Sequence, residues 1–178
     1  MIRRLPVESA TPKSVAPYGT LVAADPARAP RTGVFYGDAV ELWTQNHFVS
    51  DSDTCLSVAR VHPRPCEVVW MERHFKHTQT FVPLGGRPFV MVLGAPTSGS
   101  IPDPADVRAI FFDGQAGFMM HIGTWHEFPF AIDQTTDMLV ILRNETNRNL
   151  DVSENDEVEG DDLEKRNVRT RLGFTFAF

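Results

Sequence analysis

The hydrophobic positions of this chain form short runs that are interrupted by turn residues. Phe89–Gly94 is continuously apolar, which favours a strand buried on both faces. Cys55–His62 alternates imperfectly between apolar and polar residues, which is typical of a strand with one buried face. At the end of the chain, Val168–Phe178 is predicted to be a strand. Its apolar face carries Leu172, Phe174, Phe176 and Phe178.

The other apolar runs indicate the same fold class. A short helical turn is expected near Pro12–Pro17, and no segment predicts a long helix. Thirteen prolines, twelve glycines and thirteen phenylalanines punctuate the runs, as in all-β proteins. About nine to eleven short strands are expected, and closure into a barrel or double-sheet roll would protect their edges. The further predicted strands are Thr20–Ala24, Phe35–Trp43, Val68–Glu72, Gln79–Pro83, Val107–Phe112, Gly117–His121, Phe128–Ile132 and Asp137–Arg143.

One segment differs in composition from the rest. Residues 151–165 are dense in Asp and Glu, which predicts a solvated acidic loop or flap. No internal repeat is evident, and 178 residues suit one domain with a sizeable core. We therefore expect a single domain over residues 1–178.

Charge and composition exclude several classes of protein. The net charge is −6 and the basic residues are scattered, so no nucleic-acid partner is expected. No apolar run is long enough to span a bilayer, and the N-terminus lacks the apolar core of a secretory signal. We therefore predict a cytoplasmic protein without a membrane partner. In that compartment, Cys55 and Cys66 are expected to be thiols rather than a disulfide.

The first candidate for chemistry is a group of polar residues around the predicted strand Val68–Glu72. His74, Gln79 and Gly86 have the spacing of the first motif of cupin barrels, and Glu72 stands where that motif usually has its first histidine. Gln79 stands where the motif usually has glutamate. This match predicts the fold class more closely: an all-β, cupin-type double-stranded β-helix, or jelly-roll barrel, with minor helical turns.

The second candidate lies further along the chain. His121, Gly123 and His126 have the spacing of the second cupin motif, with His121 where proline is usual. Two histidines on either side of a glycine turn are typical of a pocket edge rather than a satisfied core. Trp125, between them, either packs in the core or contacts a substrate.

Together the two motifs predict a metal site. Imidazole and carboxylate groups suit Mn, Fe, Ni or Zn, whereas an amide is a weak ligand for all of these ions. A metal-free, hydrogen-bonded pocket is the alternative, and both remain open. His77 is expected to be exposed or on the pocket rim. The predicted metal ligands are Glu72, His74, Gln79 and His126.

Other functional classes lack their usual motifs. The chain has no glycine-rich nucleotide loop, no Gly-x-Ser-x-Gly elbow and no Cys-x-x-Cys pair, so nucleophilic triad chemistry is not supported.

The residues around both motifs resemble one family in particular. Met71–Leu84 and Gly117–Phe130 are similar to the ureidoglycolate lyase family, and Ala16–Gly19 and Asp137–Arg143 also fit, so the resemblance covers roughly residues 10–145. It implies a homodimeric cupin that cleaves (S)-ureidoglycolate to glyoxylate and urea, a carbon–nitrogen lyase of the amidine type. It also implies a divalent metal, Ni²⁺ or Mn²⁺.

The chain departs from the family in one region. An Asn-x-Gly…Arg segment is usual early in the chain, but Gly33–Trp43 keeps only the glycine. A different carbinolamine or α-hydroxy acid is therefore an alternative substrate, with Tyr36 as a candidate contact. A sugar isomerase, a dioxygenase and a non-catalytic small-molecule-binding cupin are further alternatives.

The chemistry of ureidoglycolate suggests a role for each group. Its central carbon bears a hydroxyl, a carboxylate and the ureido nitrogen, so expelling urea needs a base for the hydroxyl proton and an acid for the nitrogen. His126 or His121 is the candidate base, because imidazole titrates near neutral pH. Glu72 is either a metal ligand or the partner acid. In a metal-free site, Arg73 or Lys76 would neutralise the substrate carboxylate.

Overall fold

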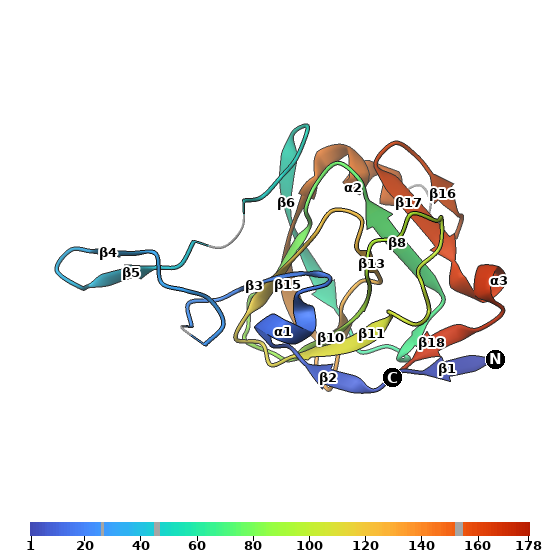
Figure 1. The fold of residues 1–178 in the computed structure, drawn as a ribbon, viewed down its shortest axis with the longest axis horizontal. Coiled ribbons are helices and arrows are strands. Elements are labelled where there is room, and N and C mark those ends of the chain that lie inside the picture. Colours follow the sequence, from blue (N-terminus) through green and yellow to red (C-terminus); the bar gives the residue numbers. More distant parts are fainter. Residues whose placement is uncertain (26, 45–46, 152–154) are drawn as a thin grey trace.

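The computed structural model describes residues 1–25, 27–44, 47–151 and 155–178. Its strands form three packed layers, with a five-stranded sheet, an eight-stranded sheet and a three-stranded sheet in that order (Figure 1). The all-β class predicted from the pattern is confirmed. None of the helices among the described residues has the length and apolar character needed to cross a bilayer.

The five-stranded sheet has the order β3-β12-β9-β15-β6. Its longest pairing joins β15 to β6 in antiparallel register, from Thr136 opposite Val61 to Arg143 opposite Thr54. The strands are β3 (Gly19–Val22), β6 (Thr54–Val61), β9 (Thr80–Pro83), β12 (Gly117–Met120) and β15 (Thr136–Arg143).

The eight-stranded sheet carries the motif residues. Its order is β16-β17-β8-β13-β10-β11-β2, and β14 pairs with β10 beside β13. The strands are β2 (Val7–Ser9), β8 (Trp70–His74), β10 (Phe89–Gly94), β11 (Arg108–Phe112), β13 (Trp125–His126), β14 (Phe130–Ala131), β16 (Val158–Glu159) and β17 (Leu163–Asn167).

The remaining elements cover and extend these two sheets. The three-stranded sheet has the order β1-β18-β7 and joins both ends of the chain, with β1 parallel to β18. A separate hairpin of β4 and β5 extends away from the body as an arm (Figure 1). These elements are β1 (Ile2–Arg4), α1 (Pro12–Val15), β4 (Gly33–Phe35), β5 (Val40–Leu42), β7 (Glu67–Val68), α2 (Asn144–Asp151), α3 (Val168–Leu172) and β18 (Thr175–Ala177).

The alternation of β10 explains the layers. Phe89, Met91 and Leu93 point into the core shared with the five-stranded sheet. Val90 and Val92 point into the second core, shared with the three-stranded sheet. Because successive side chains of a strand face opposite ways, a strand between two layers must be apolar throughout. The prediction that Phe89–Gly94 is buried on both faces is therefore confirmed.

Two predicted elements differ from the structure. Val168–Phe178 is not one strand: α3 comes first, capped by the Asn167 side chain and ended by Gly173 in the left-handed conformation, and only then does β18 follow. Phe35–Trp43 is a hairpin with a turn rather than an extended segment.

Cys55 and Cys66 are free thiols, as expected.

The acidic segment is more ordered than its composition predicted. Residues 152–154 lie outside the described residues, but β16 and β17 account for much of the remainder. Asp162 and Glu164 are both buried, because each carboxylate has specific hydrogen-bond donors around it. The prediction of a solvated loop over 151–165 is therefore wrong for these residues.

Candidate metal centre and active site

The two sequence motifs meet because β8 and β13 are neighbours. His126 pairs with Glu72 across this ladder, and with Leu93 on the other side. Directly paired residues point to the same face, and Leu93 belongs to the core between the two large sheets. Glu72 and His126 therefore face the interior of the roll, and so does His74, two positions along β8.

These three side chains form a compact cluster. Ligand atoms of Glu72, His74 and His126 all lie within 4.8 Å of one another. Glu72 Oε1 is 3.4 Å from His126 Nε2 and 3.9 Å from His74 Nε2. Both histidines are buried, whereas the Glu72 side chain remains 15% exposed.

The protonation states follow from burial and contacts. Burial, together with the neighbouring His126, lowers the pKa of His74 to about 3, so this ring is neutral at pH 7. Burial raises the pKa of Glu72, but the contacts with His126 and His74 outweigh it and lower the pKa overall. The cluster at neutral pH is thus a carboxylate beside a neutral imidazole.

The tautomer of His126 is fixed by its backbone contact. Its Nδ1 lies 3.0 Å from the Thr124 carbonyl oxygen, which can only accept a hydrogen bond. Nδ1 therefore carries a proton, and in the neutral ring the lone pair is on Nε2, which faces the cluster. Among the described residues, His126 Nε2 has no hydrogen-bond partner.

Unpaired buried nitrogens are what a metal site requires. Neither ring nitrogen of His74 has a hydrogen-bond partner within the described part of the chain, and the Oε1 atom of the buried Gln79 also lacks one. Leaving such groups unpaired is costly, so each one needs an explanation. A divalent ion held by Glu72, His74 and His126 would satisfy His126 Nε2 and one ring nitrogen of His74.

His77 is buried, which corrects the prediction that it is exposed or on the rim. The strand β8 ends at His74 and the chain bends at Phe75, so the alternation of the strand no longer applies. His77 is 1% exposed and its Nδ1 lies 3.2 Å from Asp162 Oδ2. Asp162 was missed, because nothing in the acidic segment distinguishes it from its neighbours.

Lys165 is a second residue that sequence reasoning missed. It lies on β17 directly opposite Glu72, is only 8% exposed, and lowers the pKa of Glu72 together with the histidines. Its Nζ is 4.9 Å from the Trp70 ring. A lysine in the middle of an acidic segment gives no sign of burial, and only the pairing of β17 with β8 places it beside the cluster.

Three predicted substrate contacts lie away from the cluster. Arg73 alternates to the opposite face of β8, where Glu164 and the carbonyl oxygens of Thr97 and Gly99 occupy its guanidinium. Trp125 is fully buried on that same face, with Arg73 4.4 Å above its ring. Lys76 Nζ lies 3.4 Å from the exposed Asp161.

Two further predicted residues are exposed. His121 follows β12 on the surface, where its backbone N–H donates to the Tyr18 carbonyl oxygen. Tyr36 is 87% exposed at the turn of the β4–β5 arm. The structure therefore does not bring either residue to the cluster within one chain.

The carboxylate of Glu127, next to His126, pairs with Arg64 rather than with a residue of the cluster. Its Oε1 atom lies 3.6 Å from Arg64 Nη2. Burial raises the pKa of Glu127 to about 7, although Arg64 opposes this shift. This residue flanks the cluster rather than joining it.

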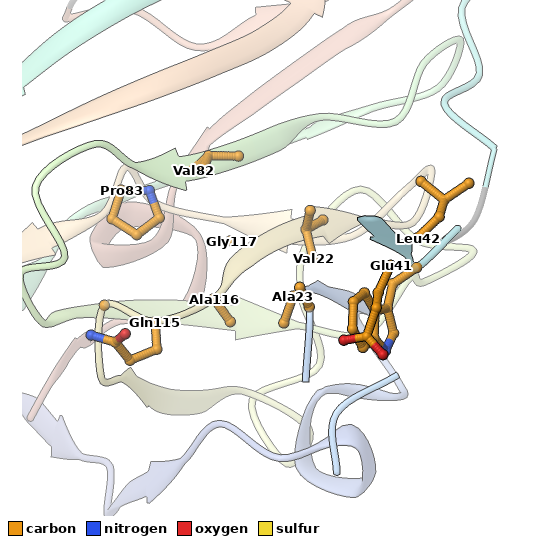
Figure 2. A pocket seen from close by; sticks show the side chains of 12 residues that line it. Val22, Ala23, Glu41, Leu42, Val82, Pro83, Gln115, Ala116 and Gly117 are labelled. Atoms are coloured by element: carbon orange, nitrogen blue, oxygen red, sulfur yellow. The ribbon is translucent and has the colours of Figure 1, made fainter. Parts of the chain in front are cut away.

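A surface pocket beside the arm lies apart from the cluster. It has a volume of about 410 Å³ between β3, β9 and β5, and Figure 2 shows Val82, Gln115 and Glu41 along its walls. Its carboxylate, Glu41, is paired with Arg31. Among the described residues that line it there is no imidazole beside this carboxylate.

Comparison with known proteins identifies one family. A family model described as ureidoglycolate lyase matches residues 2–160. The ureidoglycolate lyase of Pseudomonas syringae pv. tomato is 30% identical over 159 residues, covering 84% of this chain and 89% of the relative. That of Azotobacter vinelandii is 37% identical over 94 residues, covering 53% and 55%.

One solved structure is also similar in outline. A dTDP sugar isomerase from Desulfovibrio desulfuricans G20 has a TM-score of 0.40 and 16% identity, covering 70% of this chain and 76% of that one. A likeness of this degree says nothing about function.

The fold and the cluster define the class of protein: an all-β fold with two buried imidazoles and a carboxylate on its inner face. The matches over nearly the whole chain specify it further. The chain belongs to the ureidoglycolate lyase family.

Proposed function

We propose that this protein cleaves (S)-ureidoglycolate to glyoxylate and urea, with the Glu72–His74–His126 cluster as its active site. The observation that carries the proposal is the convergence of both family motifs on one buried cluster with unpaired nitrogens. The reaction balances without water or an oxidant: the hydroxyl proton leaves, the carbon–nitrogen bond breaks, and the nitrogen gains a proton.

Binding of the substrate carboxylate is assigned to Lys165. The family resemblance implies an anionic substrate, and Lys165 is the buried cation that faces Glu72. Arg73, the candidate from the sequence, lies on the opposite face of β8, where it donates to Glu164 and to two carbonyl oxygens. A lysine ammonium in a low-dielectric interior attracts a carboxylate far more strongly than it would at the surface.

Proton transfer centres on His126. Its Nε2 lone pair faces the cluster, so it can accept the hydroxyl proton and return it to the departing nitrogen. Glu72, 3.4 Å away, stabilises the imidazolium that forms.

The proposal has a second version, in which the site holds a metal ion. Glu72, His74, Gln79 and His126 would hold Ni²⁺ or Mn²⁺, and such an ion would lower the pKa of the substrate hydroxyl. In this version His126 is a metal ligand, so His126 is required with or without a metal.

The test is release of urea and glyoxylate from (S)-ureidoglycolate by metal-stripped protein, with and without Mn²⁺ or Ni²⁺. Release that is absent in His126→Ala and retained in His62→Asn is the expected result. His62 is an exposed histidine bonded to Thr135, so it is a matched control. Folded wild-type protein that releases neither product with any of these ions would refute the proposal and favour a different carbinolamine.

Quaternary structure and location complete the proposal. A cytoplasmic homodimer is the state that the family resemblance implies. Exposed apolar side chains on β6 and on the β4–β5 arm, among them Leu56, Val58 and Phe35, supply surface for such a contact.

A further inference from the structure

A second group of buried donors adjoins the first and shares one residue with it. Ligand atoms of His74, His77 and Asp162 lie within 4.8 Å of one another, as those of Glu72, His74 and His126 do. All three members of this second group are buried. Among the described residues, no single set of this compactness combines His77 with Glu72 and His126. The two groups therefore meet only at His74.

The second group has the spacing of a coordination shell. His77 Nδ1 lies 3.2 Å from Asp162 Oδ2 and forms a hydrogen bond of 3.3 Å with Asp162 Oδ1. The separation from Oδ2 is long for a charge-assisted hydrogen bond, which is about 2.7–2.9 Å. It matches the distance of about 3.3 Å between two ligands of one tetrahedral ion with bonds of roughly 2 Å. The corresponding pair of the first group, Glu72 and His126, is 3.4 Å apart.

The surroundings hold the second group in place. Asp162 accepts a hydrogen bond from the Thr146 hydroxyl and one of 2.8 Å from the Lys76 backbone N–H. A carboxylate has about four lone-pair sites, so capacity for an ion remains. His77 Nε2 is buried without a hydrogen-bond partner among the described residues, which leaves this ring with an unused polar atom in the interior.

His74 lies against both other imidazoles. Its ring centroid is 4.5 Å from that of His77 and 5.2 Å from that of His126. Both of its ring nitrogens are buried and lack hydrogen-bond partners in the described part of the chain. A neutral imidazole has one lone pair, so His74 can serve one ion at a time.

We propose that His74, His77 and Asp162 form a second position for a divalent transition-metal ion, occupied in alternation with the Glu72–His74–His126 position. Two imidazoles and a carboxylate suit ions such as Zn²⁺, Ni²⁺ or Co²⁺. Each group has one carboxylate, so two ions this close would repel one another strongly in the interior. The chain therefore holds one ion, which has two adjacent positions.

The proposal is tested by titrating metal-stripped protein with Co²⁺. Binding is monitored by calorimetry and by visible absorption. The wild-type protein is expected to bind about one ion per chain. The double variant Glu72→Gln/His126→Asn removes only the first position, so it still binds about one ion, with a changed absorption spectrum. Adding His77→Asn removes the remaining site and abolishes binding. His62→Asn is the control imidazole, and circular dichroism confirms that each variant is folded.

Several outcomes overturn the inference. A folded double variant that binds no Co²⁺ would leave only the first position, and wild-type protein that binds two ions would exclude alternation. Binding that survives His77→Asn in the triple variant would exclude His77 as a donor. None of these results depends on catalysis, so the inference and the proposed lyase activity succeed or fail separately.

Discussion

Both faces of the sheet around β8 carry buried polar side chains. Those on the outer face have hydrogen-bond partners, whereas those on the inner face keep unpaired nitrogens. On the outer face, Arg73 and Glu164 are 6% exposed and saturated with partners, including Arg166. On the inner face, His74 and His126 are equally buried but keep unpaired nitrogens. A protein tolerates unpaired buried groups where something else binds to them, so we assign stability to the outer network and propose a functional role for the inner cluster.

The largest expected effect is on catalysis, at the inner face. His126→Ala is expected to lower kcat by about 10²–10⁴-fold, because it removes the acid–base group or metal ligand. The free energy of unfolding should change much less than kcat. Steady-state assays measure kcat, and urea denaturation measures the free energy of unfolding. An active His126→Ala protein would show that the inner cluster is not the site of chemistry.

On the outer face the effect is expected on stability. Arg73→Met leaves the Glu164 carboxylate buried with fewer donors, and breaking a buried pair in this way costs about 3–5 kcal/mol. Urea denaturation measures this loss. The control is Arg60→Met, whose pair with Asp137 is on the surface and should matter little. Equal effects of the two variants would remove the contrast between buried and exposed pairs.

The inner face should also dominate the pH dependence of stability in metal-free protein. His74 has a pKa of about 3 in the folded state and about 6.5 when unfolded. Between these values the unfolded chain binds the proton first, so stability is full above pH 6.5 and falls as the pH drops toward 3. His74→Asn is expected to remove the His74 share of this slope between pH 6.5 and about 4.5, where Glu127, with a folded-state pKa of about 7, contributes with the opposite sign in both proteins. An unchanged slope would mean that His74 is accessible to protons.

The smallest effect is expected at His121, which the sequence motif placed beside His126. It is exposed and outside the cluster, so His121→Ala should change the free energy of unfolding by less than about 0.5 kcal/mol. Turnover should remain close to that of the wild type. A large loss of turnover would show that this histidine reaches the substrate after all.

Local patterns predicted the strands and part of the site. Glu72 and His74 are two positions apart on one strand, so period-two alternation alone places them on one face. The spacing of His121 and His126 indicated a pocket edge, but only one of the two histidines points inward. His121 lies just beyond β12 with its side chain exposed, whereas His126 pairs with Glu72 between β13 and β8.

The all-β class, the buried strand Phe89–Gly94 and the family motifs could be predicted from the amino-acid pattern, because they depend on short-range periodicity and composition. The positions of Asp162 and Lys165 beside the cluster and the burial of His77 became visible in the folded chain alone. Their place depends on the pairing of β17 with β8, which joins segments about ninety residues apart. Long-range pairing is set by the burial of whole faces, and no local pattern around Lys165 records which strand will lie opposite it.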